Sequence, residues 1–206
     1  MLIEQPPYLY RLFFPDAVWR IEKPEQKTIY LTFDDGPIPE ITPWVLNVLN
    51  RYAVKATFFC VGDNVRKYPD IYRQVIENGH RVGNHTFNHL QGWQYRSKHF
   101  LHNTNLAKEL IDSCLFRPPH GHMYIDQCEK LKKAGYRIIM WDVVTRDYSR
   151  FMSPYRVLQN VKHYTRNGSI IVFHDSLKAE KNLRFALPKA IEWLLEEGYK
   201  FELIPK

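Results

Sequence analysis

The stretch Thr28-Ile29-Tyr30-Leu31-Thr32-Phe33-Asp34-Asp35-Gly36-Pro37 decides how the rest of the chain is interpreted. Its first six residues are apolar, aromatic or β-branched, a composition typical of a buried strand. Gly36 and Pro37 then end the strand. Two adjacent carboxylates, Asp34 and Asp35, therefore stand where a buried strand ends, and a metal ion or an arginine is the usual means of holding them there. The alternative is a solvated turn, because Asp and Gly also favour turns for local reasons.

Segments with strand and helix patterns alternate along nearly the whole chain. This alternation predicts an α/β fold with a mostly parallel sheet, either open or closed into a barrel. No internal repeat, low-complexity segment or linker interrupts it, so residues 1–206 are predicted to form a single domain, with 1–27 an irregular N-terminal segment packed on the barrel. The expected strands are 28–33, 55–61, 80–85, 115–117, 136–141, 169–173 and 199–204, and the expected helices begin at Thr42-Pro43 or span 65–78, 103–113, 126–134, 154–166 and 183–197.

Composition narrows the possible partners and compartments. The net charge of +7 comes from 29 basic and 22 acidic residues, but no run of five basic residues occurs, so no nucleic-acid partner is expected. No stretch is long and apolar enough to span a membrane. Cys60, Cys114 and Cys128 show no CxxC spacing, and no signal-like apolar core begins the chain, so a cytoplasmic protein is expected. The sequence leaves the oligomeric state open.

His85 and His89 form the second informative pattern. Two histidines four residues apart would lie on one side of a helical turn, a spacing suited to one small cation. Together with Asp35 they supply two imidazoles and one carboxylate, a ligand set that leaves positions open for water and substrate. The alternative is a pair of ordinary surface histidines, since the chain has 9 histidines in total.

Five motifs in order resemble those of the polysaccharide deacetylases, also called the NodB-homology or carbohydrate esterase family 4 enzymes. The resemblance runs from about Thr28 to the C-terminus, and it implies a distorted (β/α) barrel of about seven parallel strands. The motifs are Thr32-Phe33-Asp34-Asp35-Gly36-Pro37, His85 with His89, Arg117-Pro118-Pro119-His120-Gly121, Trp141 with Asp147-Tyr148, and Val172-Phe173-His174.

The resemblance implies a role for each matched residue. Asp35, His85 and His89 would hold the metal, Asp34 would be the catalytic base, and Arg117 would orient that base. His174 would be the general acid, supported by Asp147, for which Asp142 is a rival. The backbone near His120 would donate to the oxyanion, and Pro119, Trp141 and Tyr148 would line the substrate site. Tyr148 stands where the family usually has tryptophan, which puts the shape of the substrate in question. His120 stands where tyrosine is common, but the role that the resemblance implies there belongs to the backbone.

The chemistry of amide hydrolysis needs these same parts. A metal polarises the carbonyl, a carboxylate takes a proton from water, and a histidine protonates the departing amine. The expected function is therefore metal-dependent removal of N-acetyl groups from a peptidoglycan- or chitin-like carbohydrate, with Zn²⁺ the expected metal and Co²⁺, Mn²⁺ or Fe²⁺ as alternatives. The alternatives are hydrolysis of an O-acetyl ester or a cyclic amide, and a catalytically silent glycan-binding module.

Overall fold

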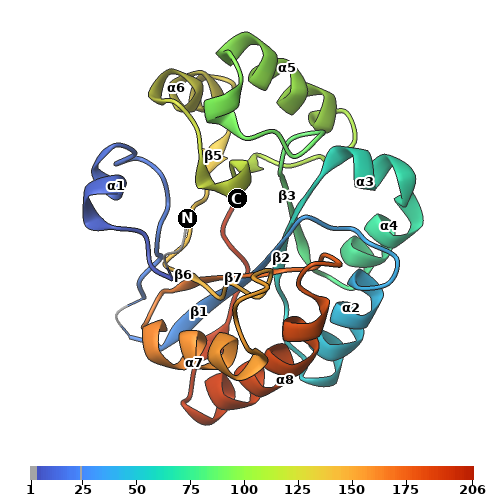
Figure 1. Cartoon of the computed structure of the whole chain (residues 1–206), viewed down its shortest axis with the longest axis vertical. Coiled ribbons are helices and arrows are strands. Elements are labelled where there is room, and N and C mark those ends of the chain that lie inside the picture. Colours follow the sequence, from blue (N-terminus) through green and yellow to red (C-terminus); the bar gives the residue numbers. More distant parts are fainter. Residues whose placement is uncertain (1–3, 24) are drawn as a thin grey trace.

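The computed structural model describes residues 4–23 and 25–206 and shows a curled parallel sheet surrounded by helices (Figure 1). Along the sheet the strands follow the order β5-β4-β3-β2-β1-β7-β6, and neighbouring strands pair in parallel. The expected barrel-like α/β fold of about seven parallel strands is confirmed. The seven strands are β1 (Thr28–Asp34), β2 (Thr57–Cys60), β3 (Arg81–Asn84), β4 (Leu115–Phe116), β5 (Arg137–Ile138), β6 (Val143–Val144) and β7 (Ile170–His174).

The helices lie on the outside of the curled sheet (Figure 1). An eighth strand, β8 (Lys200–Phe201), pairs in parallel with the start of β1. The helices are α1 (Tyr8–Leu12), α2 (Thr42–Arg51), α3 (Gly62–Lys67), α4 (Pro69–Glu77), α5 (Ser97–Lys108), α6 (Ile125–Lys133), α7 (Pro154–Tyr164) and α8 (Glu180–Glu196), with short 3-10 turns η1 (Gly92–Gln94) and η2 (Pro119–Gly121).

Strand β1 is the centre of the core, and all seven of its residues are buried. On the face toward the helices, Phe33 stacks on Phe58 of β2 and Phe173 of β7, with ring centroids 4.9 and 6.2 Å apart. Burying large aromatic side chains on adjacent strands gives the sheet much of its apolar stabilisation. The β-branched and aromatic run read from the sequence therefore forms the buried central strand, and its carboxyl end carries Asp34.

Several predicted boundaries are wrong for identifiable reasons. The helix expected over 65–78 is two helices, because Pro69 disfavours helical geometry at Tyr68, which has φ −130° and ψ 56°. Within the strand expected over 136–141, only Arg137 and Ile138 form a strand, β5, and Ile139 makes a single bridge to Val18. β6 follows as a separate strand that was not predicted. Helix α5 begins at Ser97 rather than near residue 103, and β8 is shorter than expected. Thr42 begins α2 and does not cap it, because Ile41 is the cap.

The N-terminal segment lies between the two end strands of the sheet. Val18 exchanges backbone hydrogen bonds with Ile138 and Met140 at 2.9 and 2.8 Å, and the Val144 amide donates to the Glu4 carbonyl at 2.8 Å. The segment also contains α1, which differs from the irregular structure expected for 1–27, and residues 1–3 and 24 of that range lie outside the described residues. The N-terminal segment thus bridges the open side of the curled sheet, next to the carboxyl ends of the strands.

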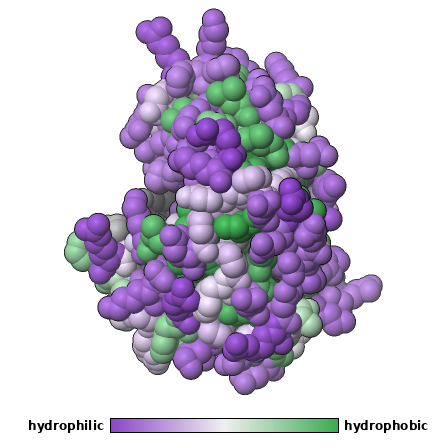
Figure 2. All heavy atoms as spheres, turned by 90° about the vertical axis from the view of Figure 1, so that its right-hand side faces the viewer, coloured by the Kyte–Doolittle hydropathy of each residue, from purple (hydrophilic) through white to green (hydrophobic). Residues whose placement is uncertain are grey.

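The face made by α3 and α4 is covered mainly by hydrophilic side chains, with apolar atoms scattered between them (Figure 2). Among the described residues, no helix is long and apolar enough to cross a membrane.

Candidate active site

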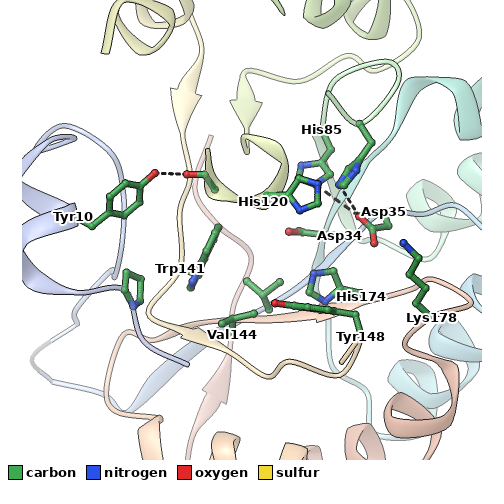
Figure 3. Close-up of a pocket in the computed structure, with 14 residues that line it drawn as sticks. Tyr10, Asp34, Asp35, His85, His120, Trp141, Val144, Tyr148, His174 and Lys178 are labelled. Carbon is green, nitrogen blue, oxygen red and sulfur yellow. Dashed lines mark hydrogen bonds and ion pairs between the residues drawn. The ribbon is translucent and has the colours of Figure 1, made fainter. Parts of the chain in front are cut away.

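The predicted site residues meet in one cavity at the carboxyl ends of the strands (Figure 3). The cavity has a volume of about 300 Å³. β1 and β7 are adjacent, and their register places Asp34 beside His174. Parallel strands bring their carboxyl ends to one face, which is why residues 140 positions apart in the chain become neighbours.

Asp34 is fixed by a buried arginine. Its Oδ1 accepts a hydrogen bond of 2.6 Å from Nη1 of Arg117, and the Arg117 side chain is fully buried. The same guanidinium donates to Thr32 Oγ1 at 2.8 Å, to the Ile139 carbonyl at 3.2 Å and to the Met140 carbonyl at 2.9 Å. Because the arginine has several fixed acceptors, it can hold Asp34 as a carboxylate in one orientation.

Asp35, His85 and His89 form a group that could hold a metal ion, with one ligand atom from each lying within 4.8 Å of the others. Asp35 Oδ1 lies 3.2 Å from His89 Nε2 and 3.9 Å from His85 Nε2. His85 Nδ1 lies 2.8 Å from the Arg117 carbonyl, to which it donates, so that Nε2 is left with its lone pair toward Asp35. Two imidazoles and a carboxylate converging in this way suit a zinc-like cation.

The charges of the group also suit a cation. Burial lowers the pKa of His85 to about 4, so its imidazole is neutral at neutral pH. Burial alone would raise the pKa of Asp35, but hydrogen bonding to His89 and the nearby histidines outweigh it and hold that pKa well below its usual range. A neutral imidazole beside an ionised carboxylate is the protonation state that a metal ligand set requires.

The histidine pair does not lie on a helix, contrary to the spacing argument. It occupies the loop after β3, where Thr86 and His89 have φ values of 62° and 55°. Asn103 of α5 holds this loop, because its Oδ1 accepts from the amides of Phe87 and Asn88 at 2.9 and 3.0 Å. Sequence analysis missed Asn103, whose position 18 residues after His85 in a helix carries no local signal.

His174 is paired with Asp147 rather than with Asp142. Nδ1 of His174 lies 2.8 Å from Asp147 Oδ1, and the His174 amide donates to Asp147 Oδ2 at 2.8 Å. Burial lowers the pKa of His174, but the charge and hydrogen bond of Asp147, with Asp35 and Asp34, outweigh it and raise the pKa to about 9. His174 is therefore protonated at neutral pH.

Asp142 makes contacts elsewhere. It is fully buried and accepts from Arg11 at 2.9 Å, Arg166 at 2.7 Å and Ser169 at 2.8 Å. Through Arg11 it anchors the N-terminal segment, so the open choice between Asp142 and Asp147 is resolved geometrically in favour of Asp147 as the neighbour of His174.

The remaining predicted residues line the cavity or adjoin it. His120 has φ 59° and its ring centroid lies 4.8 Å from that of His89. Its amide has no hydrogen-bond partner in the part of the chain that the structure describes, whereas the next amide, Gly121, donates to Pro118. Tyr148 packs edge-on against His174 with centroids 4.8 Å apart. Pro119 is buried in η2, and Trp141 lies against Gly121, where a Cβ would meet its ring at 2.3 Å.

Asp175 supports the site, although no role was predicted for it from the sequence. Its carboxylate accepts from the Gly36 amide at 3.0 Å and from Thr42 Oγ1 at 2.6 Å. A Cβ on Gly36 would meet Asp175 Oδ2 at 1.9 Å, so the glycine in the Asp34-Asp35-Gly36 turn allows this contact. Asp175 thus fixes the turn that presents the two carboxylates.

Fold and site together define a class of protein: a barrel-like α/β enzyme with a candidate metal group beside a carboxylate–arginine pair and a histidine–aspartate pair. Residues 21–139, more than half of the chain, match the family model for polysaccharide deacetylase. A peptidoglycan-N-acetylglucosamine deacetylase of Bacillus cereus is 34% identical over 193 residues, 90% of this chain and 89% of the relative. A chitooligosaccharide deacetylase of Azorhizobium caulinodans is 32% identical over 157 residues, 73% of this chain and 74% of the relative.

A solved structure also shows similarity to a deacetylase. The peptidoglycan N-acetylglucosamine deacetylase Bc1960, in complex with 4-naphthalen-1-yl-N-oxidanyl-benzamide, superposes with a TM-score of 0.85 at 28% identity, over 95% of this chain and 94% of that one. The chain belongs to the polysaccharide deacetylase family, carbohydrate esterase family 4. The resemblance carried by the five sequence motifs is thereby confirmed, and the protein is a hydrolase of the deacetylase type.

Proposed function

We propose that this polysaccharide deacetylase removes N-acetyl groups from N-acetylglucosamine units of a peptidoglycan- or chitin-like glycan with the help of one divalent metal ion. The observation that carries the proposal is the placement of Asp34 and His174 side by side on paired strands, next to the group of Asp35, His85 and His89. One relative described above is named a deacetylase of peptidoglycan N-acetylglucosamine, and the other is named a chitooligosaccharide deacetylase. The substrate class follows from that similarity, and the chemistry follows from the site.

The three-ligand group is the proposed metal site, with Zn²⁺ the expected ion. Its histidine nitrogens and carboxylate oxygen suit zinc, and Co²⁺, Mn²⁺ or Fe²⁺ have overlapping preferences. A metal held there would act as a Lewis acid on the acetyl carbonyl and make water a stronger nucleophile at neutral pH.

Asp34 is the proposed general base. Arg117 holds its carboxylate through Oδ1 at 2.6 Å, and the second oxygen is free to accept a proton from the attacking water. The His120 amide, which has φ 59° and no partner among the described residues, is the proposed donor to the oxyanion, with Pro119 fixing the turn.

His174 is the proposed general acid. An amine leaves an amide poorly unless it is protonated, and Asp147 keeps His174 in the protonated form by raising its pKa to about 9. Tyr148 and Trp141 are proposed to line the space around the acetamido group. The presence of both Asp34 and His174 argues against a catalytically silent binding module.

The deciding experiment is an acetate-release screen with protein loaded with Zn²⁺. Its substrates are N-acetylglucosamine oligomers, peptidoglycan fragments and acetylated xylan, and a cyclic amide is tested in parallel for the new carboxylate and amine that ring opening produces. We expect acetate from the first two groups, in equal amount with new free amines. Release from acetylated xylan alone would assign an O-acetyl esterase, and opening of the cyclic amide alone would assign a cyclic amide hydrolase.

The cytoplasmic location and the single-domain organisation remain predictions. Immunodetection in separated cell fractions tests the first, and limited proteolysis tests the second.

A further inference from the structure

The cavity continues past the candidate catalytic residues on the side away from Lys178 (Figure 3). We call this part the apolar lobe and define it by Pro6, Tyr10, Trp141 and Val144, all of which line the cavity. A methyl group is about the size of a water molecule, whose share of liquid volume is about 30 Å³. The cavity of about 300 Å³ includes the space beside the candidate catalytic residues as well as the lobe, and the two together hold more than an acetyl group.

The lobe offers little to a sugar. Its polar side-chain atoms are the Tyr10 hydroxyl, which donates to the Gly121 carbonyl, and the indole nitrogen of Trp141, which can only donate. A sugar ring placed there would bury several hydroxyl groups without partners, which is costly. A hydrocarbon chain loses no hydrogen bonds on entering and gains from the burial of its surface.

The direction of the lobe also fits an acyl chain. In the proposed reaction the amine nitrogen must face His174, and the acyl substituent lies on the other side of the carbonyl carbon. Figure 3 shows His174 between Val144 and Lys178, with Trp141 and Tyr10 farther along the side away from Lys178. A substrate with its nitrogen at His174 therefore directs its acyl group toward the lobe.

Tyr10 closes the far end of the lobe as a rigid wall. Its ring packs edge-on against Phe14, Trp19 and Trp93, with centroids 5.5, 5.9 and 6.4 Å away. The segment that carries it is held by the ion pair of Arg11 with the buried carboxylate of Asp142 at 2.9 Å. Because the Tyr10 ring makes this many contacts, it limits the length of the acyl chain instead of moving aside.

We propose that the apolar lobe binds the acyl chain of the substrate, so that the protein also hydrolyses amino-sugar amides with acyl chains longer than acetyl, up to the length that Tyr10 permits. This inference rests on the proposed function and extends it to a further substrate class. In the reaction water adds its oxygen to the carbonyl carbon and gives a proton to Asp34, the C–N bond breaks, and the nitrogen receives a proton from His174. The products are a short-chain fatty acid and the free amino sugar.

The test is a series of glucosamine tetramers carrying N-acetyl, N-propionyl, N-butyryl or N-hexanoyl groups, with kcat/KM measured for each. If the pocket were closed beyond the methyl, kcat/KM would fall about 10–200-fold for each added methylene. We expect the N-butyryl substrate to lie within about tenfold of the N-acetyl one. A loss of more than about hundredfold in the wild-type protein overturns the proposal, whatever the variants do.

Val144→Phe fills the lobe and is expected to lower the ratio of N-butyryl to N-acetyl kcat/KM by at least about tenfold. Phe151→Ala is the matched control, because Phe151 is 95% exposed and does not line the cavity, and it should keep the wild-type ratio. Tyr10→Ala should extend activity toward the N-hexanoyl substrate, while Tyr10→Phe, which keeps the ring, should retain the wild-type preference. An unchanged ratio in a folded Val144→Phe protein contradicts the proposal.

Binding without turnover gives a second readout. Calorimetry with acetohydroxamate, butanohydroxamate and hexanohydroxamate on zinc-loaded protein should show affinity rising about fourfold per buried methylene until the chain reaches Tyr10. Equal affinities would overturn the proposal. Two results together would assign the lobe to a sugar instead. The rate would grow with the number of sugars in the substrate, and Val144→Phe would lower that rate without changing the acyl preference. Failure to release any carboxylate from any oligomer would overturn the proposed function and this inference with it.

Discussion

Asp34 and Asp35 are neighbours in the chain but have different surroundings. Asp34 ends β1 in extended geometry and meets Arg117, whereas Asp35 has φ 85° and turns toward His85 and His89. Because Asp35 is in the left-handed conformation, the two successive carboxylates face different cations. Asp34 faces the guanidinium of Arg117, and Asp35 faces the proposed metal ion.

Replacing Asp35 or His89 by alanine should abolish tight metal binding. Each variant removes one of three ligands, and two remaining ligands cannot fix a zinc-like cation. The measurement is metal content after dialysis, by mass spectrometry. His99→Ala, a histidine outside the cavity, is the control and should retain the metal. Stoichiometric metal in Asp35→Ala would place the site elsewhere.

His174→Ala should slow amide hydrolysis far more than hydrolysis of an activated acetyl ester. A sugar amine needs protonation to leave, whereas an aryl oxide of low pKa leaves unaided, and general-acid contributions are about 10²–10⁴-fold. Turnover on both substrates measures the difference. Equal losses on amide and ester would assign His174 a structural role only.

At the scale of elements, the contacts that fix the site come from segments far apart in the chain. Asp142, just before β6, binds Arg11 in α1 and Arg166 after α7. The Asp142 carboxylate is fully buried, whereas the side chains of Arg11 and Arg166 are 21% and 48% exposed, so loss of the charge removes the acceptor of two partly hydrated arginines.

Asp142→Asn should therefore lower the free energy of unfolding by about 1–3 kcal/mol, the range for losing hydrogen bonds to charged groups, because water can solvate the exposed parts of both arginines. It should leave the amide-to-ester selectivity of the folded protein unchanged, since Asp142 does not touch His174. Urea unfolding gives the first quantity and the two turnover rates give the second. Asp147→Asn is the comparison, and it should show the selectivity of His174→Ala in weaker form. Selectivity in Asp142→Asn alone would exchange the two roles.

The sequence predicted the elements whose signals are local. The β-branched run of β1, the proline and glycine boundaries, and the ordered motifs that contain Asp34, His85 and His174 can all be recognised within a few residues. The sequence did not predict β6, the kink at Pro69, or the support that Asn103 and Asp175 give to the site loops. These features depend on partners distant in the sequence, such as the Glu4 carbonyl for Val144, and no local pattern records them.

At the scale of the whole molecule, the curled sheet concentrates charge at one end. Asp34, Asp35 and His174 line the cavity there, and Asp147 is hydrogen-bonded to His174. His174 is largely buried and its folded-state pKa of about 9 exceeds the unfolded value of about 6.5, so the folded protein holds its proton more tightly.

The stability of the metal-free protein should therefore depend on pH. The stabilisation from His174 is fully present below pH 6.5 and is lost as the pH rises through about 9, a total of about 3 kcal/mol. Chemical unfolding of chelator-treated protein between pH 6 and 10 measures it. His174→Gln, which cannot be protonated, should show a smaller loss over the same range, and an identical loss would attribute the effect to other groups.

The central claim is that Asp34 activates water for N-deacetylation beside the metal site without being one of the metal ligands. The most direct test is acetate release from an N-acetylglucosamine tetramer by wild-type protein and Asp34→Asn, both loaded with zinc to the same measured content. The account predicts that the wild type releases acetate with an equal amount of free amine, and that Asp34→Asn retains its zinc but is about 10²–10⁴-fold slower. Similar rates in the two proteins, or no acetate from the zinc-loaded wild type, would contradict it.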